Sequence, residues 1–279
     1  MKRFLLAAAT LLLCISAGAG NITRDFTGLD SFFGIDISSN FDITLQQGQE
    51  YSATVVIDTE IEQYLNVNVR NNILYVSIKG APTKLVNQIN SLSAPHPTLT
   101  ITVPDLSSIH LSGSCTLTSE ETFQGLRGEF DIFLSGASSV DRLSVAAGEL
   151  DMDVSGTSKA CILADCSSVE IEAAGMASIS VTGNCDEYGV EASGSAKVTL
   201  VGSASELECE CSGASHLDSS ELTVDKADIE CSGASTTKIN VEKVLEVSLS
   251  GVSTCLYKSD NKNLKIIPQV GRAASLKRL

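Results

Sequence analysis

A glycine-centred motif recurs along the C-terminal part of the chain at a nearly constant interval. Its copies read LSGS, LSGA, VSGT, AAGM, ASGS, CSGA, CSGA and LSGV, and their glycines are Gly113, Gly136, Gly156, Gly175, Gly194, Gly213, Gly233 and Gly251. Successive glycines are separated by 23, 20, 19, 19, 19, 20 and 18 residues. Such a period is too short for a pair of helices and too long for a heptad. Each repeat is therefore predicted to be one coil of a solenoid, in which a unit contacts only its neighbours.

The residues before each glycine alternate in polarity, and this alternation selects the kind of solenoid. Leu207, Cys209 and Cys211 stand on one side of a predicted strand, and Glu208 and Glu210 stand on the other. Period two indicates a strand with one buried and one solvated face. Glycine is expected at the corner because a tight bend between strands often needs positive φ. We predict an all-β fold, a right-handed parallel β-helix of about 18–23 residues per coil. An antiparallel sandwich would not keep one corner motif in constant register.

The first residues of the chain have the pattern of an export signal. Lys2 and Arg3 precede an apolar run, and Ala17 and Ala19 supply small residues for cleavage, so residues 1–19 are predicted to be a signal peptide. The apolar run is too short to span a bilayer, and no later segment is a transmembrane candidate. Cys14 raises the alternative of a lipoprotein, but a leucine precedes it where a small residue is expected. We therefore expect an exported protein of the periplasm or the cell surface.

The remaining chain divides into a main domain and a short tail. Residues 20–257 are predicted to form one β domain, in which residues 28–104 make a cap of strands and residues 105–257 make the coils. The cap contains a predicted hairpin around Asn71 and Asn72 and an exposed loop over 80–97, and it covers strand edges that would otherwise be unpaired. Residues 258–279 are basic and form a tail or a last capping coil, with Gly271 as a ninth, weaker copy of the corner.

Three segments together resemble a known family. They are the opening FFGIDISSNFDITLQQG, the segment YLNVNVRNNILYVSI, and the serial SGAS and SGSA corners. This combination resembles the auto-transporter adhesin head GIN domain family of exported bacterial proteins over roughly residues 28–257. The resemblance implies a β-helix and, less directly, an adhesin-like role. The chain departs from the family in placing cysteines where aliphatic residues are more common.

The polar faces of the predicted strands carry aligned carboxylates. Three residues before successive glycines stand Asp153, Glu172, Glu191, Glu210 and Glu230. Five residues before them stand Asp131, Asp151, Glu170, Glu208, Asp228 and Glu246, with Gly189 interrupting. Stacked coils would turn these sets into two columns with a spacing of ~4.8 Å.

These columns permit two interpretations. The first set supplies candidate calcium ligands, because rows of oxygen ligands suit calcium, and the surface could equally dock a basic partner. The alternative is a solvated face that keeps the solenoid soluble. Lys159, Lys197 and Lys238 are expected to pair with some of the carboxylates, although they are too few to neutralise the face.

Charge and regularity limit the function classes. The formal net charge is −15, so nucleic acid is excluded as a partner and an unknown protein or glycan at the cell envelope is expected. Parallel β-helices include polysaccharide lyases and hydrolases, but catalytic carboxylates should differ in environment, whereas these repeat in equivalent surroundings. We therefore predict no catalytic residue and no cofactor beyond calcium. The expected role is non-enzymatic interaction or scaffolding, and a polysaccharide-active enzyme, recognisable by one coil with a broken pattern, is the alternative.

Cysteines occur at equal offsets in neighbouring coils. Cys211 and Cys231 form one such pair, and Cys166 and Cys185 form another. We expect buried thiols that act as small apolar side chains, with cross-coil disulfides as the alternative in an oxidising compartment. A metal site made of Cys209, Cys211 and Cys231 is disfavoured because no histidine accompanies them.

Overall fold

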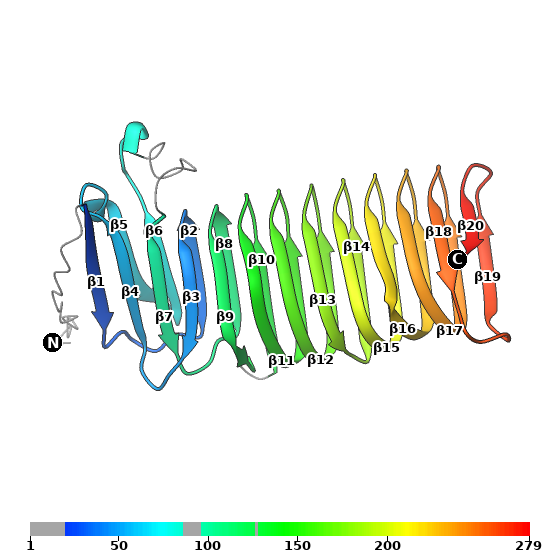
Figure 1. Cartoon of the computed structure of the whole chain (residues 1–279), viewed down its shortest axis with the longest axis horizontal. Helices are drawn as coiled ribbons and strands as arrows, with labels where there is room; N and C mark the ends of the chain where they lie inside the picture. The colour runs from blue at the N-terminus through cyan, green and yellow to red at the C-terminus, as the bar shows by residue number, and fades with distance from the viewer. Residues whose placement is uncertain (1–19, 86–95, 126–127) are drawn as a thin grey trace, which may run out of the picture.

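The computed structural model describes residues 20–85, 96–125 and 128–279 and confirms the predicted parallel β-helix. The chain is nearly all β and winds into a solenoid of about eight turns. Figure 1 shows one elongated stack, with β1 (Asn21–Thr27) at one end and β19 (Lys265–Val270) and β20 (Ser275–Arg278) at the other. The predicted signal peptide lies outside the described residues, as does the central part of the loop predicted over 80–97.

The strands fall into an N-terminal group and a repeating group. The N-terminal group continues with β2 (Gly34–Ser39), β3 (Asp42–Gln47), β4 (Ser52–Asp58), the 3-10 turn η1 (Glu62–Tyr64), β5 (Leu65–Arg70), β6 (Ile73–Ile78) and β7 (Thr98–Val103). The repeating group is β8 (Ser108–Gly113), β9 (Thr116–Phe123), β10 (Glu129–Leu134), β11 (Ser139–Val154), β12 (Lys159–Ala173), β13 (Ser178–Asn184), β14 (Glu187–Ala192), β15 (Lys197–Cys211), β16 (His216–Cys231), β17 (Thr236–Leu249), β18 (Thr254–Lys258), β19 and β20.

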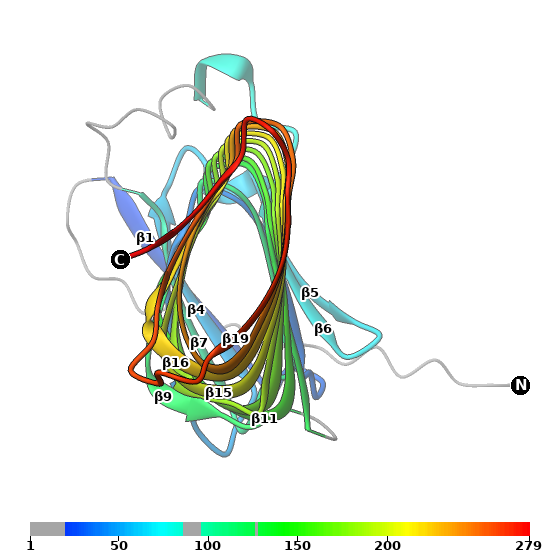
Figure 2. The ribbon, with the colours of Figure 1, turned by 90° about the vertical axis from the view of Figure 1, so that its right-hand side faces the viewer.

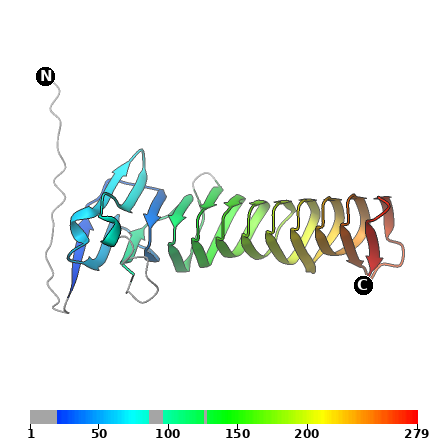
Figure 3. The same ribbon diagram turned by 90° about the horizontal axis from the view of Figure 1, so that it is seen from above.

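Each coil contributes one strand segment to each of two walls. The first wall holds the segments that lead into the corners, in the order β5, β6, β2, β8, β10 and then the later coils to β19. The second wall holds the segments that leave the corners and runs from β1, β4, β7, β3 and β9 to β20. Viewed along the axis, the coils superimpose into a flattened ring from which the β5–β6 hairpin projects (Figure 2). The stack widens at its N-terminal end (Figure 3).

The corner at Gly213 shows why glycine recurs there. Its φ is +68°, and a Cβ atom would lie 2.7 Å from the carbonyl oxygen of Gly194 in the preceding coil. The next residue, Ala214, donates its N–H to the same oxygen at 2.7 Å. A side chain would therefore be strained and would also obstruct the hydrogen bond that joins the coils. All eight glycines named from the sequence have positive φ, between 65° and 86°.

The parallel stacking begins earlier than the first glycine motif. β2 and β3 pair in parallel with β8 and β9, so they already form a coil, and its corner residue is Ser39 with a φ of +106°. The Oγ of Ser39 accepts a hydrogen bond from the N–H of Ile78 at 3.2 Å and donates to the carbonyl of the same residue at 3.3 Å. These bonds explain how a non-glycine residue is held at this corner.

The ends of the chain differ in how they finish the two walls. At the N-terminal end, β5 and β6 form the expected two-residue hairpin, with Asn71 and Asn72 at φ +50° and +61°. At the other end, β19 and β20 pair in parallel with β17 and β18. Gly271 does not occupy the corner of that last coil, because the register pairs Leu249 with Val270 and places Gly271 one residue too early.

The interior is a single continuous core of aligned apolar side chains. Leu207, Cys209 and Cys211 are buried and the glutamates between them are exposed, as the alternation predicts. Two residues after most corners a small side chain fills the bend: the buried serines are Ser138, Ser158, Ser215, Ser235 and Ser253, and alanines stand at the equivalent places in two coils. The buried interior leaves the outward side chains of the two walls as the surface on which function must be sought.

Candidate binding face

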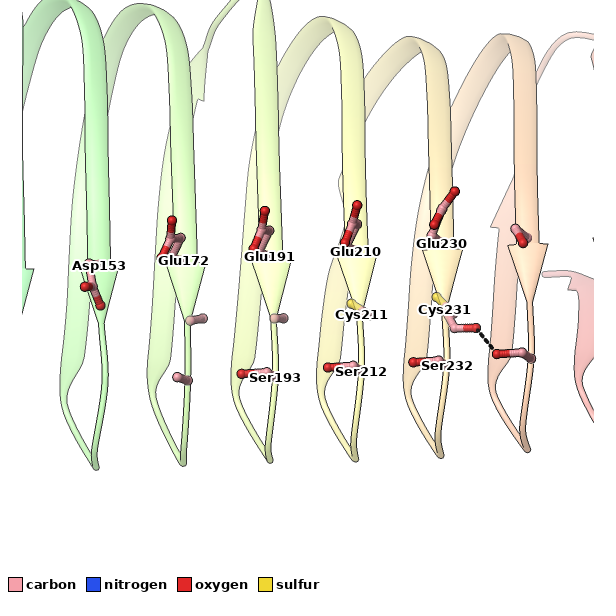
Figure 4. A pocket seen from close by; sticks show the side chains of 15 residues that line it. Asp153, Glu172, Glu191, Ser193, Glu210, Cys211, Ser212, Glu230, Cys231 and Ser232 are labelled. Carbon is pink, nitrogen blue, oxygen red and sulfur yellow. Dashed lines mark hydrogen bonds between the residues drawn. The ribbon is translucent and has the colours of Figure 1, made fainter.

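Five carboxylates form an unbroken column on the outside of the first wall. Asp153, Glu172, Glu191, Glu210 and Glu230 come from β11, β12, β14, β15 and β16, and each is the register partner of the next. Figure 4 shows their side chains one after another along neighbouring coils. We call these five residues the acidic column. All five are exposed, so the column is presented to solvent along its whole length.

A row of serines runs beside the acidic column and completes a shallow groove. The serines stand directly before the corner glycines, and Ser193, Ser212 and Ser232 are labelled in Figure 4. The groove encloses about 290 Å³ and extends from Asp153 to Ser250. Its walls therefore offer carboxylates on one side and hydroxyl groups on the other, with Ala174 in place of a serine in one coil.

The second predicted set also stacks, with the expected interruption at Gly189. Asp131, Asp151 and Glu170 are register partners in turn, and Glu170 is followed by Gly189. The carboxylate of Glu170 lies over Gly189 and takes the space that a Cβ atom would occupy there, although this flexible side chain could move aside. Partial burial and the neighbouring carboxylates raise the pKa of Glu170 and of Asp131. Burial first, and the neighbouring carboxylates second, therefore disfavour the ionised form of these two groups.

A third acidic set escaped the sequence analysis. Glu129 pairs with Glu149, and Glu187 pairs with Glu206, at a position seven residues before the corners. The set is broken by a serine and ends at Lys226, whose Nζ lies 3.9 Å from the Glu206 carboxylate. The spacing of these glutamates, about one repeat, could have identified the set from the sequence. It makes the first wall more acidic than the two predicted columns alone.

The predicted pairing of lysines with these columns is wrong. Lys238 lies on the second wall and contacts Asp218 at 2.8 Å. Although partial burial alone would raise it, the pKa of Asp218 is lowered to about 2 by hydrogen bonds from Lys238 and Ser220. Lys159 and Lys197 also lie on the second wall, and neither forms an ion pair within the described part of the chain. Lys159, Lys197 and Lys238 therefore do not neutralise the acidic column.

The acidic column is an open line of ligands. Within residues 20–85, 96–125 and 128–279, no three histidine, cysteine, aspartate or glutamate side chains converge in a manner that would hold a metal ion. Calcium usually takes six to eight oxygen ligands around one point, whereas a column offers its oxygens in succession. The described side chains thus do not fit a closed calcium site, and calcium binding by the column stays a prediction.

The eight described cysteines are free thiols, and all except Cys161 are buried. Cys211 and Cys231 are register partners, as their equal offsets predicted, and the sulfur atoms of Cys209 and Cys211 lie 3.4 Å apart. A hydrogen bond with Cys209 and burial raise the pKa of Cys211 to about 12. The buried thiols serve as apolar side chains in the core, and Cys211 and Cys231 also line the groove.

The fold is a repeating β-solenoid whose first wall presents an elongated, exposed row of carboxylates, and a family model for adhesin-like proteins matches most of the chain. The model of the family described as "Putative auto-transporter adhesin, head GIN domain" matches residues 31–175 and 163–260. The chain belongs to this family, as the resemblance seen in its sequence indicated. No relative was found among the curated proteins.

Solved structures share the fold at low sequence identity. A putative adhesin from Parabacteroides distasonis has a TM-score of 0.65 and 15% identity over 94% of this chain and 98% of its own. A putative adhesin from Parabacteroides merdae has a TM-score of 0.62 and 15% identity over 95% and 98%. A structure from Parabacteroides distasonis named as a putative lipid binding protein has a TM-score of 0.60 and 15% identity over 95% and 99%. At this identity the likeness establishes the β-helix fold. Among the described residues, no helix has the length and apolar character needed to cross a membrane.

Proposed function

We propose that this protein is an exported, non-enzymatic adhesin of the cell envelope and that its acidic first wall docks a basic partner. The unbroken register of Asp153, Glu172, Glu191, Glu210 and Glu230 carries the proposal. Family membership supports a binding role, because the family is described by adhesion. A continuous row of like charges gives long-range attraction for an oppositely charged partner and a strong dependence on salt.

The repeated environment of the column favours binding over catalysis. A general acid and a general base need different surroundings, so that one carboxyl keeps its proton while the other loses it. Glu172, Glu191 and Glu210 instead occupy equivalent register positions on successive coils, each between two buried side chains and three residues before a corner glycine. Equivalent groups suit an extended partner that contacts one coil after another, such as a lysine-rich segment.

The proposal is tested by titrating octalysine into the processed protein, residues 20–279, and into the variant E172Q/E191Q/E210Q/E230Q. Exposed ion pairs contribute about 0.2–1 kcal/mol each, so removing four should weaken binding about tenfold or more. The matched control is E50Q/E60Q/E121Q/E221Q, which removes the same charge from exposed positions outside the column. Equal weakening in both variants would mean that only net charge matters and would overturn the proposed docking face.

The calcium prediction has its own measurement. Thermal unfolding is followed with and without millimolar calcium at matched ionic strength, on the wild-type protein and on the quadruple glutamine variant. A rise of several degrees in wild type alone would show that the folded state binds calcium through the column. No rise would contradict calcium-dependent stabilisation and leave the octalysine titration to decide between a docking face and a face that only keeps the solenoid soluble.

A further inference from the structure

We propose that the N-terminal end of the first wall is a saccharide-binding site for an extended oligosaccharide chain. The acidic column continues in register beyond Asp153 into unlike residues. Phe133 is the partner of Asp153, His110 is the partner of Phe133, Asp36 is the partner of His110, and Tyr75 is the partner of Asp36. Five successive coils carry a carboxylate at this position. The strands before them carry three rings, Phe133, His110 and Tyr75, and one carboxylate, Asp36, which lies between His110 and Tyr75.

Phe133 is the side chain that breaks the repeat pattern. It is 40% exposed on the outside of a sheet, at a position that is polar in the coils on both sides. Its ring meets the ring of His110 edge to face, with centroids 4.5 Å apart and planes at 62°. The two rings stabilise each other across the strands, and together they present an exposed aromatic surface beside a hollow, on which a ligand ring can stack.

Two adjoining hollows lie on these residues. One encloses about 260 Å³ and is lined by Asp36, His110, Phe133 and Asp153 together with the serines before the corners. The other encloses about 460 Å³, lies against the projecting β5–β6 hairpin, and has Asp36, Tyr75 and Arg70 in its lining. Asp36 lines both hollows, and Asp153 lines the first hollow and the acidic groove. The three depressions therefore follow one line along the wall.

The polar groups at these hollows are available to a ligand. Asp36, Arg70 and the hydroxyl of Tyr75 form no hydrogen bond or ion pair with side chains of the described chain. Carboxylate and guanidinium groups are planar and bind pairs of neighbouring groups, which suits the vicinal hydroxyls of a sugar. Aromatic rings stack on the apolar faces of pyranose rings. The combination therefore selects a polyhydroxylated ring compound over a purely cationic ligand.

The spacing along the wall fits a chain of sugars. Tyr75 and Phe133 lie three strand positions apart, on β6 and β10, which is roughly 14 Å at the usual strand separation. One strand separation is close to the length of one pyranose unit in an extended glycan. Each coil would then face one sugar unit, with rings above the units at Tyr75 and Phe133 and hydrogen bonds at Asp36.

The site rests on the proposed adhesin function but is tested separately from the acidic column. The processed protein and the variants Phe133→Asp and Tyr75→Ala are applied to a printed microarray of oligosaccharides in high salt, which screens the acidic column. Phe133→Asp gives its coil the acidic side chain that the following coils carry, so the fold should persist. The matched control is Leu163→Asp, which replaces an apolar side chain, 43% exposed, on the outside of β12.

The expected result is binding to a set of linear oligosaccharides by wild type and by Leu163→Asp, with affinity about tenfold lower in Phe133→Asp and Tyr75→Ala. Absence of any bound oligosaccharide, or equal binding by all four proteins, would overturn the site and leave octalysine docking unaffected. Cleavage of a bound glycan would support the site and overturn the non-enzymatic function proposed above.

Discussion

At the residue scale, the corner glycines have a defined energetic role. Gly213 combines a positive φ with a carbonyl oxygen at the place that a Cβ would take, whereas Gly271 lacks a positive φ. We expect Gly213→Ala to lower the free energy of unfolding by about 1–3 kcal/mol, because left-handed strain alone costs about 1–2 kcal/mol. Gly271→Ala should cost much less. Denaturant unfolding of both variants checks this, and equal costs would contradict the assigned corner.

Two carboxyl groups of the second predicted column make stability depend on pH. Glu170 and Asp131 have raised pKa values, so the folded protein holds their protons more tightly than the unfolded chain. Stability is then greatest below the ordinary pKa values, 4.5 and 3.8, and falls as pH rises through the raised values. Asp218 acts in the opposite direction, since its lowered pKa adds stability that is lost only as pH falls from 3.8 towards about 2.

The resulting prediction is a melting temperature that rises as pH is lowered from neutrality towards the ordinary carboxyl pKa. Glu170→Gln should raise the melting temperature at neutral pH and flatten this dependence, because it removes one of the crowded charges. Glu221→Gln, an exposed change on the second wall, is the control. A melting temperature that rises with pH above the ordinary carboxyl range in wild type would contradict the assignment.

At the scale of single elements, the coil formed by β2 and β3 has Ser39 in place of a corner glycine, and substitutions at Ser39 show how this corner is stabilised. Ser39→Ala keeps the positive φ and loses both hydrogen bonds to Ile78, whereas Ser39→Gly loses the hydrogen bonds but relieves the strain. Each bond contributes about 0.5–1.5 kcal/mol, so the alanine variant should be the least stable of the three proteins and the glycine variant should lie between. Thermal unfolding gives the order. An alanine variant as stable as wild type would rule out the proposed support from Ile78.

The same elements show what a sequence can and cannot predict here. Strands, corners and the acidic column followed from periodicity, because the burial of alternate residues and the corner conformation restrict residue type in every coil. The coil formed by β2 and β3 was missed because Ser39 replaces glycine and its support comes from a residue 39 positions away. The role of Phe133 was missed for a related reason: its register partner His110 pairs in turn with Asp36, and the strands of these two residues, β8 and β2, are separated along the chain by β3 to β7.

At the scale of the whole molecule, the repeats should be removable as units. Deleting residues 157–194 takes out two successive 19-residue repeats and joins Gly156 to Ser195 in the same register. Each coil contacts only its neighbours, so the shortened chain should fold and unfold cooperatively. Small-angle scattering should show a molecule shorter by two strand spacings, roughly 10 Å.

The deletion also removes Glu172 and Glu191 from the acidic column. Octalysine should therefore bind more weakly and with a smaller dependence on salt, while oligosaccharide binding at the N-terminal end should be unchanged. A chain that aggregates, or that loses oligosaccharide binding as well, would contradict the independence of the coils.

The placement of β1 and β20 at opposite ends of the stack has a mechanical consequence. Hydrogen bonds between coils lie along the long axis, so tension applied between the two ends would load them directly. Because each coil contacts only its neighbours, the solenoid would unfold one coil at a time under tension. Each unfolded coil would lengthen the chain by a short segment. If both ends of the molecule were attached, a sudden force would be absorbed in steps, and the two attachment points would stay connected through the unfolded coils.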